Sequence, residues 1–207
     1  MNERNIPYSG AQGGAPAINK VLKNTYLLLS MTLLFSGAMA YAGVVMGISH
    51  GAGLISTIAG IVMLWFVLPR TAESAAGIPV IFAITGLLGL GLAPVVGYYL
   101  AADPTIVMTA LGGTGAIFLG LSAYAVVSRR DFSFMGGFLF VGLFVVIGAA
   151  VLNIFLQMPV LFLVINAAIV LIMSGLILWE TSRIIHGGET NYIMATAGLF
   201  ISLLNLF

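Results

Sequence analysis

The chain has 207 residues, of which 61% are hydrophobic and 6% are charged, with a formal net charge of +1 and a mean hydropathy of +1.17. Soluble domains are roughly 45–50% apolar and about 25% charged, so this composition predicts an integral membrane protein in a lipid bilayer. The charge balance excludes a basic face for nucleic acid, and the absence of cysteine excludes disulfides and thiolate metal sites.

The first twenty residues begin at Met1, end at Lys20 and contain almost no large apolar side chains. Such a segment cannot bury enough surface to fold. Residues 1–20 are therefore predicted to form a disordered tail, and residues 21–207 a single transmembrane domain. The following apolar run, YLLLSMTLLF, and the small-residue string GAMAYA imitate a secretory signal with its cleavage site. An uncleaved first helix is favoured, because the hydrophobicity continues through Val45 and a polar extension precedes it.

Seven apolar runs are long enough to cross about 30 Å of hydrocarbon, which takes about 20 helical residues. They cover residues 24–47, 52–68, 76–100, 105–127, 134–156, 160–179 and 191–207. Unbroken runs of this length are typical of helices, one of the two structures that satisfy backbone polar groups in lipid. We predict an all-α membrane protein with seven transmembrane helices. The last run stops without a polar flank, so we expect the native chain to continue past Phe207.

The basic residues indicate how these helices are oriented. Arg4, Lys20 and Lys23 precede the first run, Arg70 follows the second, Arg129 and Arg130 follow the fourth, and Arg183 follows the sixth. All seven therefore fall on one side of the membrane, which the positive-inside rule makes cytoplasmic. The amino terminus is predicted to be cytoplasmic, and Phe207 to lie near the outer face.

Small residues recur every four positions in three places, which lets helix backbones approach closely. These stripes are Gly43, Gly47 and Gly51; Gly89, Ala93 and Gly97; and Gly112, Ala116 and Gly120. The run GGTGAIFLG lacks the Gly-Lys-Ser/Thr ending of a phosphate loop, so helix packing is favoured over nucleotide binding. Pro94 should kink its helix, and a role in architecture is favoured over a gating hinge.

The remaining polar residues show no hydrolase or redox constellation, and His50 and His186, on separate loops, are too few for a metal site. We expect neither enzymatic activity nor a cofactor. Asp103 is interpreted as a helix cap before Pro104, and Asp131 as a solvated loop charge. For three asparagines within the runs, interhelical hydrogen bonding is the favoured interpretation. They are Asn153, Asn166 and Asn205.

The stretch WETSRIIHGGETNY, residues 179–192, concentrates polarity in an otherwise apolar chain. Glu180 follows Trp179, a residue type that anchors helices at the membrane interface. Arg70 and Arg183 are the cations available to Glu180. An acidic residue within a transmembrane segment suggests a functional site, but a structural ion pair at the helix end explains it equally well, and both interpretations stand.

The order of these segments and their amino-acid sequences resemble those of the Bax inhibitor-1 family of seven-span membrane proteins. The resemblance covers nearly the whole chain and is strongest in ALGGTGAIFLGLSAYAVVSRRDFSFMGG, NIFLQMPVLFLVINAAIVLIMSGLILWETSRIIHGGETNYI and FISLLNLF. It implies six helices surrounding a central seventh. Within the family, the sequence is most similar to the bacterial branch that modulates the membrane-anchored protease FtsH. This resemblance implies a bacterial inner-membrane protein whose partner is the FtsH-type protease complex.

The resemblance also implies a gate. Other bacterial members are described as pH-sensitive calcium leaks, closed by two aspartates that share a proton beside an arginine. Carried across, the acid of the sixth helix falls on Glu180 and the cation on or beside Arg70. The acid of the seventh helix falls where this chain has Ser202, and a serine cannot share a proton as a second carboxylate does. We expect Ser202 or Asn205 to lie close enough to hydrogen-bond to Glu180.

Two functions therefore follow from the sequence. The first is a modulator of an FtsH-type protease that engages the tail from Met1 to Lys20. The second is a leak for calcium, other cations or protons, gated by Glu180, Arg70, Arg183, Ser202 and Asn205. Calcium takes six to eight oxygen ligands, and the spans offer few acids beyond Glu180, so only a weak leak is compatible with the composition.

Overall fold

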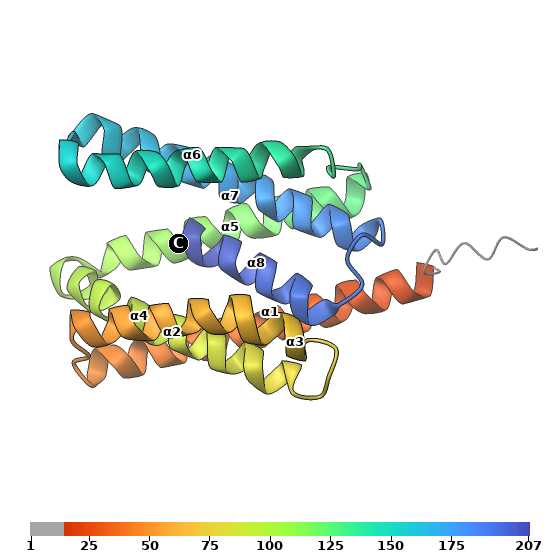
Figure 1. The fold of residues 1–207 in the computed structure, drawn as a ribbon, viewed down its shortest axis with the longest axis horizontal. Coiled ribbons are helices and arrows are strands. Elements are labelled where there is room, and N and C mark those ends of the chain that lie inside the picture. The colour runs from red at the N-terminus through yellow and green to blue at the C-terminus, as the bar shows by residue number, and fades with distance from the viewer. Residues whose placement is uncertain (1–14) are drawn as a thin grey trace, which may run out of the picture.

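The computed structural model describes residues 15–207, and every regular element in that range is a helix (Figure 1). The elements are α1 (Ala15–Val45), α2 (His50–Val62), the π-helical η1 (Met63–Val67), α3 (Leu68–Thr71), α4 (Gly77–Ala102), α5 (Pro104–Ser128), α6 (Met135–Leu156), α7 (Pro159–Ile185) and α8 (Tyr192–Leu206). Since α2, η1 and α3 form one continuous span, six helices are long and apolar enough to cross a membrane, and α8 is a shorter apolar helix. The seven-helix prediction is confirmed.

Two helix ends differ from the expectation. Helix α1 begins at Ala15, so residues 15–20 are helical, which the Pro16 ring favours because its fixed φ suits a first helical turn. Residues 1–14 lie outside the described residues, and there the disordered tail stays a prediction. Helix α7 continues beyond residue 179 to Ile185. The predicted end at residue 179 was wrong because the helix carries its polar residues out of the apolar region without losing backbone hydrogen bonds.

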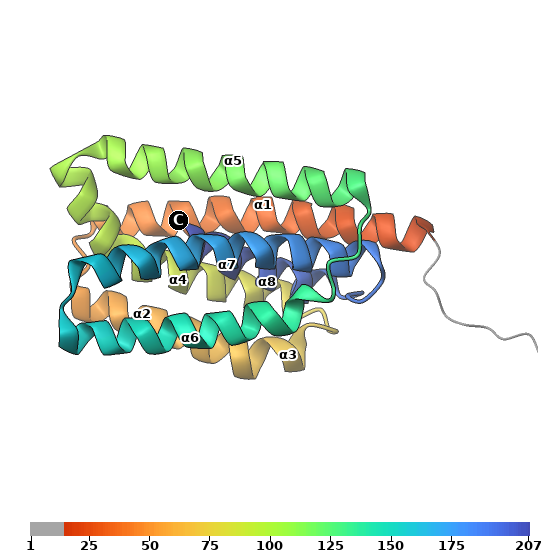
Figure 2. The ribbon, with the colours of Figure 1, turned by 90° about the horizontal axis from the view of Figure 1, so that it is seen from above.

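Helix α8 lies in the middle of the bundle. In Figure 1, α6 and α7 lie on one side of it and α1 to α4 on the other, and in Figure 2 it lies between α5 and α1 on one side and α2 and α6 on the other. It packs mainly against α7 and α1, and less extensively against α4 and α5. Helix α6 rests chiefly on α7, and α2 rests chiefly on α4. The central position of the seventh span agrees with the expectation, but α2 and α6 lie one layer farther out.

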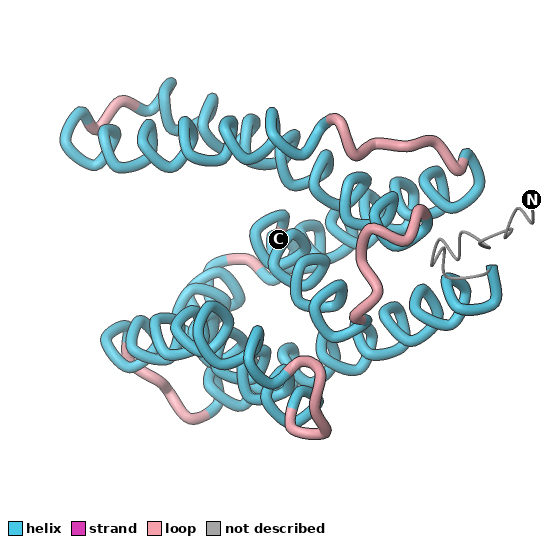
Figure 3. Tube along the Cα trace, turned by 45° about the vertical axis from the view of Figure 1, so that its right-hand side comes forward, coloured by secondary structure: helices cyan, strands magenta, loops and turns pink. Residues whose placement is uncertain are grey.

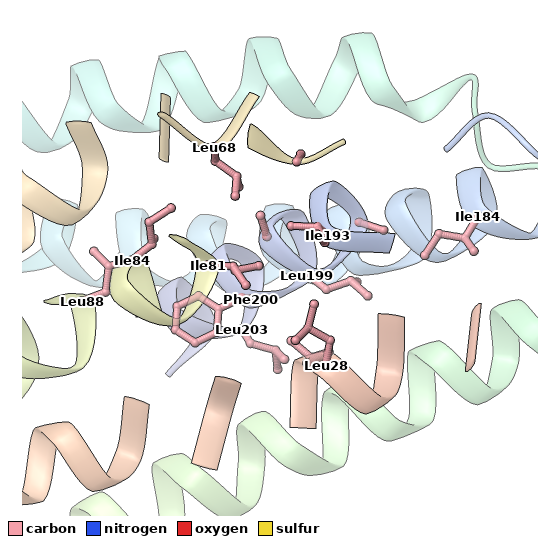
Figure 4. Close-up of a cluster of buried hydrophobic side chains, with 14 of the residues drawn as sticks. Leu28, Leu68, Ile81, Ile84, Leu88, Ile184, Ile193, Leu199, Phe200 and Leu203 are labelled. Carbon is pink, nitrogen blue, oxygen red and sulfur yellow. The ribbon is translucent and has the colours of Figure 1, made fainter. Parts of the chain in front are cut away.

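Short loops join the helices (Figure 3), and the hydrophobic core surrounds α8. Apolar side chains from five spans converge on this helix (Figure 4). Leu199 and Phe200 of α8 are almost inaccessible to solvent and belong to one cluster with Leu29, Ile81 and Ile177. The short helix α8 therefore lies at the centre of the hydrophobic core.

The small-residue stripes divide into those that pack and those that do not. A Cβ atom at Gly43 would lie 2.5 Å from that of Ala93, and a Cβ atom at Gly89 would collide with the backbone of Ser36, so α1 and α4 approach closely as predicted. The stripe on α5 was interpreted wrongly. No atom lies within 4 Å of a Cβ atom at Gly112 or Gly120, because this face of α5 meets no other helix.

The rest of the first stripe also does not pack. Gly47 and Gly51 have no atom within 4 Å of an added Cβ atom, since they lie at the connection between α1 and α2. Gly47 instead provides a positive φ of 64° just after α1, a conformation that costs glycine little.

Asp103 caps α5 as expected. Its Oδ1 accepts hydrogen bonds from the backbone N–H of Thr105 at 2.9 Å and from the Thr105 hydroxyl at 2.7 Å. The hydroxyl and the backbone N–H of Thr105 hold the pKa of Asp103 below its usual value. On the other side of the membrane, hydrogen bonds from Ser133 lower the pKa of Asp131, an exposed loop residue.

Candidate functional site

Glu180 lies in α7, where its side chain is only 14% exposed. Its carboxylate rests directly on α8. A Cβ atom added at Gly198 would lie 2.5 Å from Oε1 and 2.7 Å from Cδ of Glu180. The bare backbone at Gly198 therefore provides the space into which this carboxylate fits, and the acid of α7 is in contact with the central helix.

The cation beside Glu180 is Arg183. Its Nη1 lies 3.8 Å from Oε2 of Glu180, and its Nη2 lies 3.4 Å from Oε2 of Glu189. The guanidinium also lies over the indole ring of Trp179, with Cζ 4.6 Å from the centroid, and Nη2 donates to the carbonyl of Gly188 at 3.3 Å. Arg183 thus joins two carboxylates, an aromatic ring and the turn that follows α7.

Arg70 does not take the expected place. It is exposed, and its guanidinium donates to the carbonyl of Phe66, in the preceding turn of its own span. Within residues 15–207, the two ion pairs are both made by Arg183. The expected pairing of Glu180 with Arg70 is therefore wrong. Arg183 is three residues further along the same helix, which places the two side chains on one face.

The two candidates on α8 have different surroundings. Ser202 is 3% exposed and lies four residues after Gly198, about one turn farther from the start of α8. Asn205 is exposed, and its Nδ2 donates to the carbonyl of Ile201 at 2.8 Å. In the described part of the chain, neither side chain hydrogen-bonds to Glu180, so that expectation is not met.

Asn191 is a residue whose importance the sequence reasoning missed. Its Oδ1 accepts from the backbone N–H groups of Ile193 at 2.9 Å and Met194 at 3.2 Å, which caps α8. Its Nδ2 donates to the carbonyl of Ala72 at 3.0 Å, just after α3. An asparagine immediately before an apolar run is a helix-start signal, so the cap was readable from the sequence. The link to Ala72, 119 residues away, was not.

A second polar cluster holds the α5–α6 loop against the end of α7. Ser182 Oγ accepts from the backbone N–H of Phe132 at 2.9 Å and donates to the carbonyl of Arg130 at 3.3 Å. His186 places Nε2 3.1 Å from the carbonyl of Arg129 and Nδ1 2.9 Å from that of Ser182. The loop that carries two of the basic residues is therefore fastened to α7.

These contacts describe a polar junction at one end of the bundle, where the end of α7 meets α8, α3 and the α5–α6 loop. Its charges are Glu180, Arg183 and Glu189, with the cation between the two carboxylates. Across residues 15–207, no three His, Cys, Asp or Glu side chains gather closely enough to hold a metal ion. The arrangement is suited to fixing these helices relative to one another.

Comparison with known proteins gives a family match across almost the whole chain. The profile described as "Inhibitor of apoptosis-promoting Bax1" matches residues 18–207. An "Uncharacterized membrane protein" of Vibrio cholerae is 49% identical over 191 residues, which are 91% of this chain and 86% of that protein. The "Modulator of FtsH protease YccA" of Escherichia coli K12 is 50% identical over 190 residues, with the same coverage. The protein of E. coli O6:H1 with the same identity and coverage is named "Inner membrane protein YccA".

Proposed function

The chain belongs to the Bax inhibitor-1 family of multi-pass membrane proteins, and on that premise we propose that it modulates an FtsH-type protease in a bacterial inner membrane. The observation that carries the proposal is the 50% identity with the E. coli modulator over 91% of this chain. Identity at that level over nine-tenths of the chain supports the same fold in both proteins, and so a similar surface for a partner.

We further propose that the end of the bundle that carries the polar junction faces the cytoplasm. The start of α1, the α5–α6 loop and the α7–α8 turn lie at the same end (Figures 1 and 2), and the Lys and Arg residues of the described range occur there. Reporter fusions after residues 72, 130 and 187 should read as cytoplasmic, and those after residues 50, 103 and 158 as external. An external reading at residue 130 would contradict this orientation.

The start of α1 is the segment proposed to engage the protease. The apolar helix runs over 30 residues from Pro16 to Val45, about 45 Å at 1.5 Å per residue. This exceeds the hydrocarbon thickness of about 30 Å, so its first turns extend past the neighbouring helices (Figure 2). These first turns, which include Lys20, belong to the tail from Met1 to Lys20 that we propose an unfolding motor engages.

The test is a crosslinking pull-down from native membranes with three forms of the protein. These are the full chain, a chain lacking residues 2–14, and a chain in which those residues are replaced by an equally long Gly/Ser segment. We expect the full chain to recover the protease and to be degraded, and the shortened chain to persist. The Gly/Ser form distinguishes two ways in which the protease could recognise the tail. If the protease needs only an unstructured segment, this form should still be degraded. If it needs the specific sequence, this form should persist. Equal degradation of all three forms would contradict the role of the tail.

The second candidate function is a weak cation or proton leak controlled at the polar junction. The observation in its favour is the contact of the Glu180 carboxylate with the central helix at Gly198. A change of charge at Glu180 would alter both its contact with α8 at Gly198 and its ion pair with Arg183. Flux of calcium and protons into reconstituted vesicles, compared between the protein and its Glu180→Gln variant, tests this function. Equal flux from both would place any conduction elsewhere.

A further inference from the structure

The loop that joins α5 to α6, residues 129–134, carries two adjacent exposed arginines, Arg129 and Arg130. Neither of them takes part in the two ion pairs found within residues 15–207. The acid next to them is Asp131, whose Oδ1 instead accepts a hydrogen bond from a backbone N–H of the same loop at 2.8 Å. Within the described part of the chain, the loop therefore presents two guanidinium groups that no carboxylate neutralises by direct contact.

The backbone conformation at Arg129 suits glycine better than arginine. Its φ is 49° and its ψ is 25°, in the left-handed region, where helices that end in this way usually have glycine because a Cβ atom is crowded there. A cation near the end of α5 interacts favourably with the helix dipole, but Arg130, which has no positive φ, already supplies one. The fold itself therefore does not require an arginine at residue 129.

The backbone of this loop is held against α7. The carbonyl of Arg129 lies 3.1 Å from Nε2 of His186, and the carbonyl of Arg130 accepts a hydrogen bond from Ser182 Oγ at 3.3 Å. The backbone N–H of Phe132 donates to the same Ser182 Oγ at 2.9 Å. Because the backbone is fixed at both arginines, less conformational entropy is lost when the loop binds a ligand. The two arginines are thus placed in advance for binding.

The loop lies at the level of the lipid headgroups. Helix α5 has 25 residues and α6 has 22, about 37 Å and 33 Å at 1.5 Å per residue. Both exceed the hydrocarbon thickness of about 30 Å, so the loop between them stands beside the phosphates. Val127, just before the arginines, is 82% exposed, and Phe134, just after them, is 81% exposed. Two charged side chains are therefore flanked on both sides by large apolar ones.

This combination selects among anions. A guanidinium group binds a phosphate with two parallel hydrogen bonds, and basic residues next to a transmembrane helix attract anionic lipids. A free phosphate or an acidic protein segment would satisfy the two charges but would not use the flanking apolar side chains. A zwitterionic headgroup would bring its own ammonium group close to the two arginines. An anionic phospholipid matches both the charged and the apolar parts of the surface.

We propose that the α5–α6 loop binds the headgroup of an anionic phospholipid of the adjacent leaflet through Arg129 and Arg130, with the acyl chains of the lipid along Val127 and Phe134. The lipid phosphate bridges the two guanidinium groups. Since the loop is fastened to α7 by Ser182, the bound lipid is connected through the backbone to the end of α7.

The first test measures lipid preference. The protein is reconstituted in nanodiscs that contain equal amounts of phosphatidylglycerol and phosphatidylethanolamine and is then released into detergent, and the retained lipids are counted by native mass spectrometry. We expect several-fold more phosphatidylglycerol than phosphatidylethanolamine on the natural protein. Arg129→Gly and Arg130→Gln should each lower this excess several-fold. Arg70→Gln is the matched control, because it removes one exposed guanidinium group outside the loop, and it should keep the excess.

The second test separates lipid binding from folding. Because glycine suits the left-handed backbone, Arg129→Gly should not lower the melting temperature in uncharged detergent. Added phosphatidylglycerol should raise the melting temperature of the natural protein, since a ligand of the folded state stabilises it. The rise should persist in Arg70→Gln and be largely lost in Arg129→Gly. Glycerol 3-phosphate at the same concentration should cause no rise. An equal rise with this soluble compound would overturn the proposal in favour of a site for free phosphate.

The lipid count also has a result that overturns the proposal. This result is equal retention of phosphatidylglycerol by Arg129→Gly, Arg130→Gln and Arg70→Gln. If the two loop variants then also failed to recover the protease in the crosslinking pull-down, the arginines would be assigned to an acidic protein surface instead of a lipid.

Discussion

Replacement of Gly198 by alanine tests whether the seat of Glu180 depends on the bare backbone of the central helix. The new Cβ atom would lie 2.5 Å from Oε1 of Glu180, a distance at which something must move. Overpacking of this kind costs about 1–3 kcal/mol. Alanine in place of glycine in an unobstructed helix stabilises it by about 0.5–1 kcal/mol. Gly120→Ala on α5, with no atom within 4 Å, isolates that second effect.

Unfolding of the variants is compared in the same detergent micelles. We expect Gly198→Ala to be less stable than Gly120→Ala by about 1–3 kcal/mol. Combination of Gly198→Ala with Glu180→Ala removes the obstructing carboxylate, so a double-mutant cycle should show that the two substitutions compensate. Equal stability of the two glycine variants, or purely additive effects in the cycle, would refute the assignment of Gly198 as the seat of Glu180.

Three further predictions concern other parts of the fold. Asp103→Ala should lower the melting temperature at neutral pH, because the substitution removes the side-chain cap of α5. The folded-state pKa of Asp103 is lowered, so the stability that its charge contributes is present above the unfolded value near 3.9 and is lost as the pH falls through the folded value. The difference in melting temperature between the two proteins should therefore shrink as the pH is lowered below the unfolded value. Arg183→Gln should destabilise the protein by about 1 kcal/mol, because the ion pairs of Arg183 and its contact with Trp179 are lost. Arg70→Gln should leave the stability within about 0.5 kcal/mol of the natural value. Equal losses in the two variants would contradict the assignment of Arg183 as the cation paired with Glu180. Ser182→Ala should cost about 1–3 kcal/mol, because the N–H of Phe132 loses its acceptor, and hydrogen exchange of that amide should accelerate.

The seven spans were predictable because each is a long apolar run, and in lipid such a run leaves the backbone few alternatives to a helix. The residues at which the helices end were less predictable. Helix α7 passes residue 179 because a helix can carry Glu180 and Arg183 toward water without losing its hydrogen bonds. Hydropathy reports where the apolar region stops, which is a different position from the last helical residue.

The candidate site was predicted in part. Glu180 and Arg183 are three residues apart on a helix, so their proximity follows from helical geometry. The distances from Glu180 and Arg183 to Arg70 and Gly198 depend on how the separate spans are rotated and tilted relative to one another. The sequence of a single span does not determine that arrangement. The α5 stripe shows the same limit: Gly112 and Gly120 look like Gly43 and Gly89 in the sequence, yet only the latter pair meets a neighbouring helix.

The central place of α8 has a consequence for biosynthesis. All six longer spans leave the ribosome before Tyr192 to Leu206 is made, yet Leu199 and Phe200 complete the cluster to which Leu29 and Ile81 belong. The contacts of Leu29 and Ile81 with the side chains of α8 can therefore form only after α8, the last of these helices, has been made. The packing of α8 between α1 and α7 is in this way a late event of biosynthesis, although this helix lies at the centre of the folded bundle.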